Sequence, residues 1–165
     1  MITIESITAQ NVLTFKTARL AALRDAPSAF GSTYARESQF SDAVWLDRAS
    51  KSTSERSAGY LAMDGASSCG IAWVTGDNQD PSVAWVVSMW VAPTHRRRGV
   101  GRLLINTIVT WARDRAIRTL KLMVTSNNDP AICFYQRLGF KATGNTEPYP
   151  NDPMLVENEM SRRLT

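Results

Sequence analysis

The sequence predicts a mixed α+β fold built on a mostly antiparallel sheet. Three observations lead to this prediction. Apolar residues at helical spacing occupy much of the first 50 positions, short β-type runs separated by turn residues follow between positions 59 and 91, and two units then combine a helical pattern with a strand pattern. A chain of 165 residues fits one domain of ordinary size, so we expect residues 1–165 to form a single domain.

The first half of the chain opens with alternating apolar and polar residues, which predict a strand over 2–5. Helical spacing predicts a helix over 11–24, which Pro27 ends. A more polar helix is expected over 41–49, with Ser41 or Asp42 as its cap and with Trp45 and Leu46 buried. Residues 50–57 are polar, and we expect a mobile surface loop there.

The second half alternates strands with helices. Three strands are predicted over 59–63, 70–75 and 83–91, and the third is so apolar that we expect it to be central in the sheet. Further elements are predicted as helix 100–116, strand 119–125, helix 130–138, a strand from Phe140, and a last strand over 154–160. The segment 144–153 holds three prolines, which favour a stiff, shaped loop.

The junction between the central strand and the next helix carries the pattern R-x-x-G-x-G, from Arg96 to Gly101. A strand, a basic loop with glycines and a helix N-terminus together form an anion site, because free N–H groups and the helix dipole point at one place. A phosphate-binding G-x-x-x-x-G-K-[ST] loop is absent, and Leu104 replaces the third glycine of a dinucleotide fingerprint.

A second pattern lies about 30 residues further on. Asn128 is followed by Ala131, then by Tyr135, and then by Gly139 and Phe140. Asn128 or Asp129 would cap this short helix, and Gly139 would end it. Both patterns, in this order and at this separation, resemble the signatures of the GCN5-related N-acetyltransferase (GNAT) family. The resemblance spans nearly the whole chain, although the first 80 residues match less specifically.

The resemblance implies a splayed central sheet with helices on both faces and acetyl-CoA as co-substrate. It implies direct acetyl transfer to a primary amine, for which we favour a small molecule over a protein. Tyr135 would be the catalytic general acid that protonates the departing CoA sulfur, because a phenol is protonated at neutral pH. No metal is expected. The expected cofactor-binding residues are Met89, Trp90, Val91, Arg96, Arg97, Arg98, Gly99, Val100, Gly101, Arg102, Asn128 and Tyr135.

The general base and the acceptor site are less defined. Many family members carry a glutamate on the fourth strand, but residues 86–89 hold no carboxylate. A water chain, Ser88 or a more distant carboxylate (Glu37, Asp42 or Glu147) remains open as the base, and His95 adjoins the basic loop. We expect the acceptor pocket between residues 25–40 and the loop 144–153, where an ammonium group would meet Tyr34, Glu37, Glu147 or Tyr149.

The composition limits the kinds of ligand and partner that we expect. The net charge of +4 is modest, and the arginines concentrated in residues 96–118 indicate an anionic ligand; without interleaved aromatic residues they do not favour nucleic acid. Two cysteines without a disulfide framework suit a cytoplasmic protein, and no membrane segment is expected. A homodimer is left open. Two alternatives to a small-molecule enzyme also stay open: a non-catalytic acyl-CoA-binding module, and an acetyltransferase of protein N-termini or lysines.

Overall fold

The apolar run Val83–Val91 forms β4, the middle strand of a seven-stranded sheet in the order β1-β2-β3-β4-β5-β7-β6. The computed structural model describes all residues from 1 to 165. The other strands are β1 (Ile2–Ser6), β2 (Ser57–Asp64), β3 (Ser67–Gly76), β5 (Thr119–Thr125), β6 (Lys141–Pro148) and β7 (Val156–Arg163). The predicted mixed, mostly antiparallel sheet is confirmed, and β4 is central as its composition indicates.

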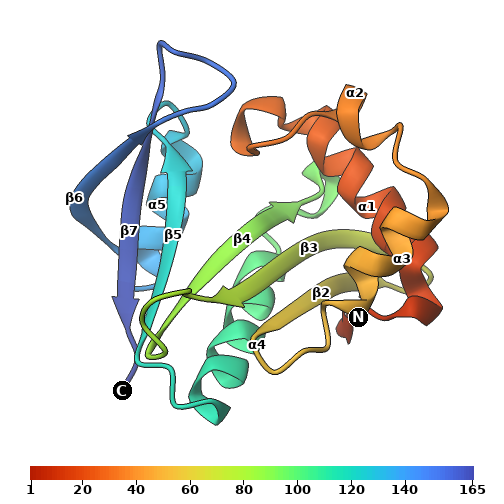
Figure 1. Cartoon of the computed structure of the whole chain (residues 1–165), viewed down its shortest axis with the longest axis horizontal. Coiled ribbons are helices and arrows are strands. Elements are labelled where there is room, and N and C mark those ends of the chain that lie inside the picture. The colour runs from red at the N-terminus through yellow and green to blue at the C-terminus, as the bar shows by residue number, and fades with distance from the viewer.

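The sheet splits in its middle. β4 and β5 are the only parallel neighbours, and they pair over just three residues, Val83–Trp85 against Thr119–Lys121. Beyond Trp85 the two strands diverge and open a V, which Figure 1 shows between the arrows of β4 and β5. Along the open stretch β4 keeps β3 as its partner on one edge and has no strand on the other. The splayed sheet that the family resemblance implies is therefore present.

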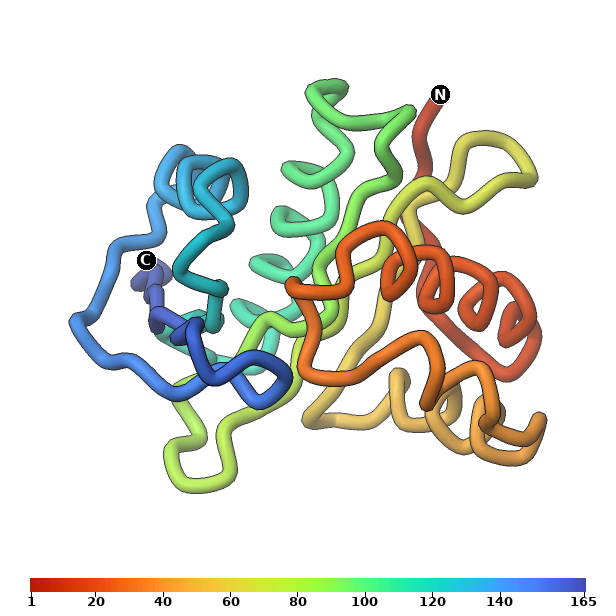
Figure 2. Tube along the Cα trace, turned by 90° about the horizontal axis from the view of Figure 1, so that it is seen from above, coloured from red at the N-terminus to blue at the C-terminus, as the bar shows by residue number.

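Helices cover both faces of the sheet. α1 (Val12–Asp25) and α3 (Asp42–Ser50) lie on one face of β2–β4, and α4 (Val100–Asp114) lies on the other (Figures 1 and 2). α5 (Asp129–Arg137) packs against the half of the sheet formed by β5 and β7. Each face has its own apolar core: Phe15, Trp45 and Leu61 belong to the first, Leu104 and Ile108 to the second. None of the helices has the length and apolar character needed to span a bilayer.

Four segments differ from what the sequence indicates. The connector after Pro27 contains a short 3-10 helix, η2 (Pro27–Ala29), and a four-residue helix, α2 (Tyr34–Glu37), both too short to show a period. Leu46 is exposed, because only one face of α3 meets the core and Trp45 occupies it. The segment 50–57 is anchored by Ser52, which is buried and donates to the backbone of Ile7 and Ala49. The first half of the predicted loop 144–153 belongs to β6.

Candidate functional site

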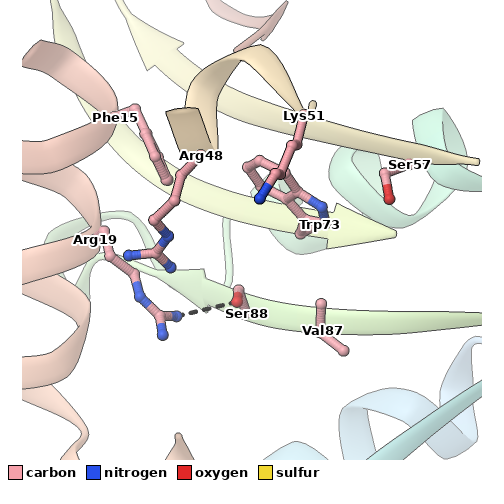
Figure 3. Close-up of a pocket in the computed structure, with 8 residues that line it drawn as sticks. All are labelled: Phe15, Arg19, Arg48, Lys51, Ser57, Trp73, Val87 and Ser88. Atoms are coloured by element: carbon pink, nitrogen blue, oxygen red, sulfur yellow. Dashed lines mark hydrogen bonds between the residues drawn. The ribbon is translucent and has the colours of Figure 1, made fainter. Parts of the chain in front are cut away.

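The open edge of β4 carries a local distortion at the mouth of the V. Ser88 and Met89 face the single residue Ala72 of β3, which makes a β-bulge. Ser88 has a φ of 57°, in the left-handed region that a serine seldom occupies. Such backbone strain costs on the order of 1–3 kcal/mol and concentrates at ligand sites. The bulge directs the Ser88 side chain toward α1, as Figure 3 shows.

The basic loop after β4 presents a run of backbone donors. None of the N–H groups from Arg97 to Arg102 donates to a protein acceptor, and the first bond of α4 runs from the N–H of Leu103 to Gly99. Arg97 and Gly99 both have positive φ, of 62° and 81°. Successive N–H groups in such a conformation form a concave nest for an anion, and the N-terminus of the 15-residue helix α4 adds its dipole.

The four arginines of this loop region divide into two groups. Arg97, Arg98 and Arg102 are exposed, and their side chains have no hydrogen-bonded protein partner. Arg96 instead donates from Nε to the Val91 carbonyl at 3.0 Å and from Nη2 to Asp25 Oδ2 at 2.5 Å. The same Asp25 oxygen accepts from Trp90 Nε1 at 2.9 Å. Arg96 and Trp90 therefore fasten the loop and β4 to the end of α1.

Gly101 has a packing reason in addition to the phosphate approach expected from the sequence. A Cβ added at Gly101 would lie 2.7 Å from the ring of Phe134 and 3.3 Å from Cε of Met89. Only a glycine lets α4 approach α5 this closely. Val100 beside it is fully buried. The close contact joins the first turn of α4, the open strand and α5 into one unit.

Tyr135 lies on α5 with its ring between two other aromatic rings, 5.3 Å from Phe134 and 5.7 Å from Phe140. The residue is 8% exposed, and burial raises the pKa of its phenol above the usual range. No protein group hydrogen-bonds its hydroxyl, and this oxygen is not among the fully buried unpaired side-chain atoms, so it keeps some access to solvent. Two turns before it, Asn128 caps α5 by accepting from the N–H of Ala131 through Oδ1 at 3.3 Å, which leaves its amide nitrogen free to donate.

A pocket of about 270 Å³ lies on the face of the sheet opposite to α4, between α1, α3 and the strands (Figure 3). Its lining residues are Phe15, Arg19, Arg48, Lys51, Ser57, Trp73, Val87 and Ser88. Arg19 Nη1 donates to Ser88 Oγ at 3.0 Å, and this hydrogen bond links the bulge of β4 to the wall of the pocket. A positively charged neighbour makes the Ser88 hydroxyl a weak base, since it disfavours the gain of a further proton.

Glu37 does not offer a free carboxylate to an ammonium group, contrary to expectation. It is buried, and its two oxygens accept from Arg19 at 2.9 and 3.0 Å and from Arg48 at 2.8 Å. Burial alone would raise the pKa of Glu37, but the hydrogen bonds from Arg19 and Arg48 lower it to about 2. A carboxylate this acidic is a poor general base at neutral pH.

The remaining candidates for the acceptor site, and His95 beside the basic loop, are either engaged by other groups or exposed. Tyr149 is buried and donates to the Phe30 carbonyl at 2.6 Å, while Asn151 donates to that carbonyl at 3.1 Å. Tyr34 lies under the Arg24 guanidinium, 4.2 Å from ring centre to Cζ. Glu147 is exposed on β6, opposite Glu157. His95 pairs with Asp64 at 2.9 Å on the sheet side of the basic loop.

Comparison with known proteins identifies the class to which this fold and site belong. The model of the acetyltransferase (GNAT) family matches residues 20–140. The match covers most of the chain, including the anion loop and α5, so the chain belongs to the GNAT family.

Two curated relatives and one solved structure illustrate the range of the family. Streptothricin acetyltransferase of Streptomyces lavendulae is 46% identical over 54 residues, which are 33% of this chain and 29% of that protein. A peptidyl-lysine N-acetyltransferase of Salmonella typhimurium is 30% identical over 91 residues, 47% of this chain and 59% of that one. PaiA N-acetyltransferase of Thermoplasma acidophilum, solved with coenzyme A, has the same fold with a TM-score of 0.75, 14% identity and 99% coverage of both chains. The matches to the curated relatives thus span about a third to three fifths of their length.

Proposed function

We propose that this protein transfers the acetyl group of acetyl-CoA directly to the primary amine of a small molecule, with residues 1–165 acting as one acetyltransferase domain. The proposal rests above all on the unpaired backbone donors from Arg97 to Arg102, which fit the diphosphate of CoA. Membership of the GNAT family supports the same co-substrate. Cys69 and Cys133 are both free, which suits a reducing compartment such as the cytoplasm.

The proposed cofactor site runs along the V. The diphosphate lies on the N–H groups of Arg97–Arg102, with the exposed arginines Arg97, Arg98 and Arg102 adding charge-assisted bonds. Backbone groups of Met89–Val91 line the open edge of β4, where the amides of the pantetheine arm pair as an added strand would. The free amide nitrogen of Asn128 is placed to donate to the same arm.

The chemistry needs no covalent enzyme intermediate. The lone pair of a neutral amine attacks the thioester carbonyl carbon, the C–S bond breaks, and the acetyl group leaves on nitrogen as an amide. Tyr135 gives its phenolic proton to the departing sulfur, which leaves as a thiol. The proton lost from nitrogen passes to water, and the phenolate regains a proton from water before the next cycle. The raised pKa of Tyr135 keeps the phenol protonated until sulfur needs the proton.

The size of the pocket beside Ser88 supports a small acceptor. Its volume of about 270 Å³ is just below the range of roughly 300–1,000 Å³ that ligand pockets usually have. The pocket lies on the α1 face of β4, while the anion loop leads into α4 on the opposite face. An amine in the pocket and a thioester in the V would therefore meet at the bulge of β4.

A panel of amines incubated with acetyl-CoA tests the proposal. We expect release of free thiol that depends on both the enzyme and one class of small amine, together with a product heavier than the amine by one acetyl group. Binding of CoA without thiol release above the hydrolysis background, for small amines and peptides alike, would instead indicate a non-catalytic acyl-CoA-binding module.

A further inference from the structure

The pocket beside Ser88 has an unusual charge balance for a protein that acetylates amines. Three cationic side chains line it, Arg19, Arg48 and Lys51, and no carboxylate does. Two carboxylates stand behind them: Glu37 is shared by both arginines, and Asp47 pairs with Lys51 at 2.9 Å. One positive charge on the pocket wall is therefore uncompensated. Figure 3 shows Arg48 and Lys51 above Ser88, with Arg19 beside it.

Arg48 is held rigidly with most of its donors unused. Its guanidinium lies over three aromatic rings, 5.0 Å from Trp45, 5.7 Å from Phe15 and 5.8 Å from Phe40. It donates one hydrogen bond, from Nη1 to Glu37, out of the five that a guanidinium can make. The fixed plane and the free N–H groups are what bidentate recognition of a carboxylate requires.

Lys51 is available as a second contact. Its pair with Asp47 joins two side chains that are 69% and 61% exposed, and such a pair contributes little to stability. The Lys51 ammonium can therefore move to an anion in the pocket at small cost. The Ser88 hydroxyl accepts from Arg19, which leaves its own proton free to donate in the same space.

This arrangement disfavours an acceptor that carries only positive charge. An ammonium group near Arg19 and Arg48 loses its proton more readily, because like charges favour the neutral amine. That helps the attack on the thioester without a carboxylate base. The same field repels a polyamine from the pocket, so the acceptor needs a negative group of its own to be retained.

Resting on the proposed function, we propose that the acceptor is a small amino carboxylate, of the α-amino acid class, with its carboxylate on Arg48 and Lys51 and its amine directed at the bulge of β4. The pocket volume of about 270 Å³ suits such a molecule. A protein N-terminus is excluded by the same chemistry, because a peptide bond has replaced the carboxylate next to its amine.

A three-arm substrate panel tests the inference. The protein is given acetyl-CoA with each of the common amino acids, with the matching amino acid amides, and with amines that lack a carboxylate, including spermidine. We expect at least one amino acid to be acetylated with a kcat/KM more than tenfold above that of its amide, because a charge-assisted bidentate contact is lost. Each amide also stands for a peptide N-terminus.

Two variants locate the carboxylate contact. Lys51→Met removes an exposed ammonium, and we expect it to raise KM for the amino acid several-fold while KM for acetyl-CoA stays unchanged. Lys141→Met, the same change at an exposed position on β6, is the matched control and should alter neither. Arg48→Lys keeps a charge beside Glu37 but loses the planar fork, so the preference for amino acid over amide should fall.

The possible outcomes separate this inference from the proposed function. Acetylation of amides or spermidine at rates equal to or above those of amino acids overturns the inference and leaves the acetyltransferase intact. No thiol release with any of the three arms overturns the proposed function and the inference together. A preference for amino acids that Lys51→Met and Arg48→Lys both leave unchanged overturns the assignment of the carboxylate site.

Discussion

The hydroxyl of Tyr149 donates to the carbonyl of Phe30 at 2.6 Å and thereby joins the β6–β7 loop to the segment after α1. These two segments are 119 residues apart in the sequence and lie side by side in Figure 2. Thr125 adds a second link to this segment, from its hydroxyl to the Ser28 carbonyl at 2.8 Å. The two halves of the splayed sheet are therefore tied together above the V. Phe30 connects this link to the proposed acceptor site, because the Arg19 guanidinium lies 5.0 Å from the centre of its ring.

Loss of the Tyr149 hydroxyl should loosen this tie. We expect Tyr149→Phe to lower the free energy of unfolding by about 1–2 kcal/mol, since a buried acceptor loses its shorter hydrogen bond. KM for the acceptor amine should rise more than KM for acetyl-CoA. Denaturant unfolding and steady-state kinetics measure both effects. Tyr34→Phe is the control, because the Tyr34 ring keeps its stacking with Arg24; equal effects of the two variants would refute a specific role for Tyr149.

Tyr135→Phe tests the proposed proton donor. Turnover should fall by roughly 10²–10⁴-fold, which is the usual contribution of a positioned general acid. Affinity for CoA and the circular dichroism spectrum should be unchanged, because the ring keeps its contacts with Phe134 and Phe140. Tyr60→Phe is the control: it removes a phenolic hydroxyl from a tyrosine of β2, and turnover should be retained. Wild-type turnover in folded Tyr135→Phe would reduce Tyr135 to a packing residue.

The anion loop predicts a ligand-dependent gain in stability. CoA at a concentration of 100 times its Kd should stabilise the fold by about 2.7 kcal/mol. Arg102→Glu should abolish most of the associated rise in Tm. Yet the unliganded variant should unfold no more easily than the wild type, because an acidic residue suits the first turn of a helix. Arg113→Glu, in the last turn of α4, should keep the response to CoA. An unaltered response in Arg102→Glu would contradict the placement of the diphosphate.

Strong local patterns made much of the fold predictable. β4 and β5 begin and end where the sequence indicates, because both are apolar runs bounded by turn residues. The capping role of Asn128 and the positive φ of Gly139, 90°, also follow from local chemistry. Four-residue α2 escaped detection because a single turn shows no period.

The acceptor site was the least predictable part of the structure, because ion pairs between residues far apart in the sequence form it. In the sequence, Glu37 follows the first predicted helix and belongs to no predicted element. Nothing in the neighbouring residues indicates that it is buried and paired with Arg19 and Arg48, which come from two other helices. The pocket wall likewise combines α1, α3 and three strands. The sequence explains Gly101 only by the close approach of a phosphate, whereas the structure shows that its close packing against Phe134 also requires a glycine.

The buried cluster around Glu37 should give the protein a defined acid limit. Because the folded-state pKa is lowered from 4.5 to about 2, the ionised carboxylate stabilises the fold fully above about pH 4.5. This contribution, on the order of 3 kcal/mol, is lost as the pH falls from 4.5 toward 2. Denaturant unfolding measured between pH 7 and pH 2 should show the loss.

Glu37→Gln isolates that contribution. The variant should be less stable at pH 7, because Arg19 keeps no charged partner, and the portion of the pH dependence due to Glu37 should vanish. If the variant does not fold, carbon NMR of the Glu37 carboxyl in the wild type reports its titration directly. A midpoint near 4.5 in that titration would mean that Arg19 and Arg48 do not hold the carboxylate in solution, and the charge balance inferred for the pocket would fail with it.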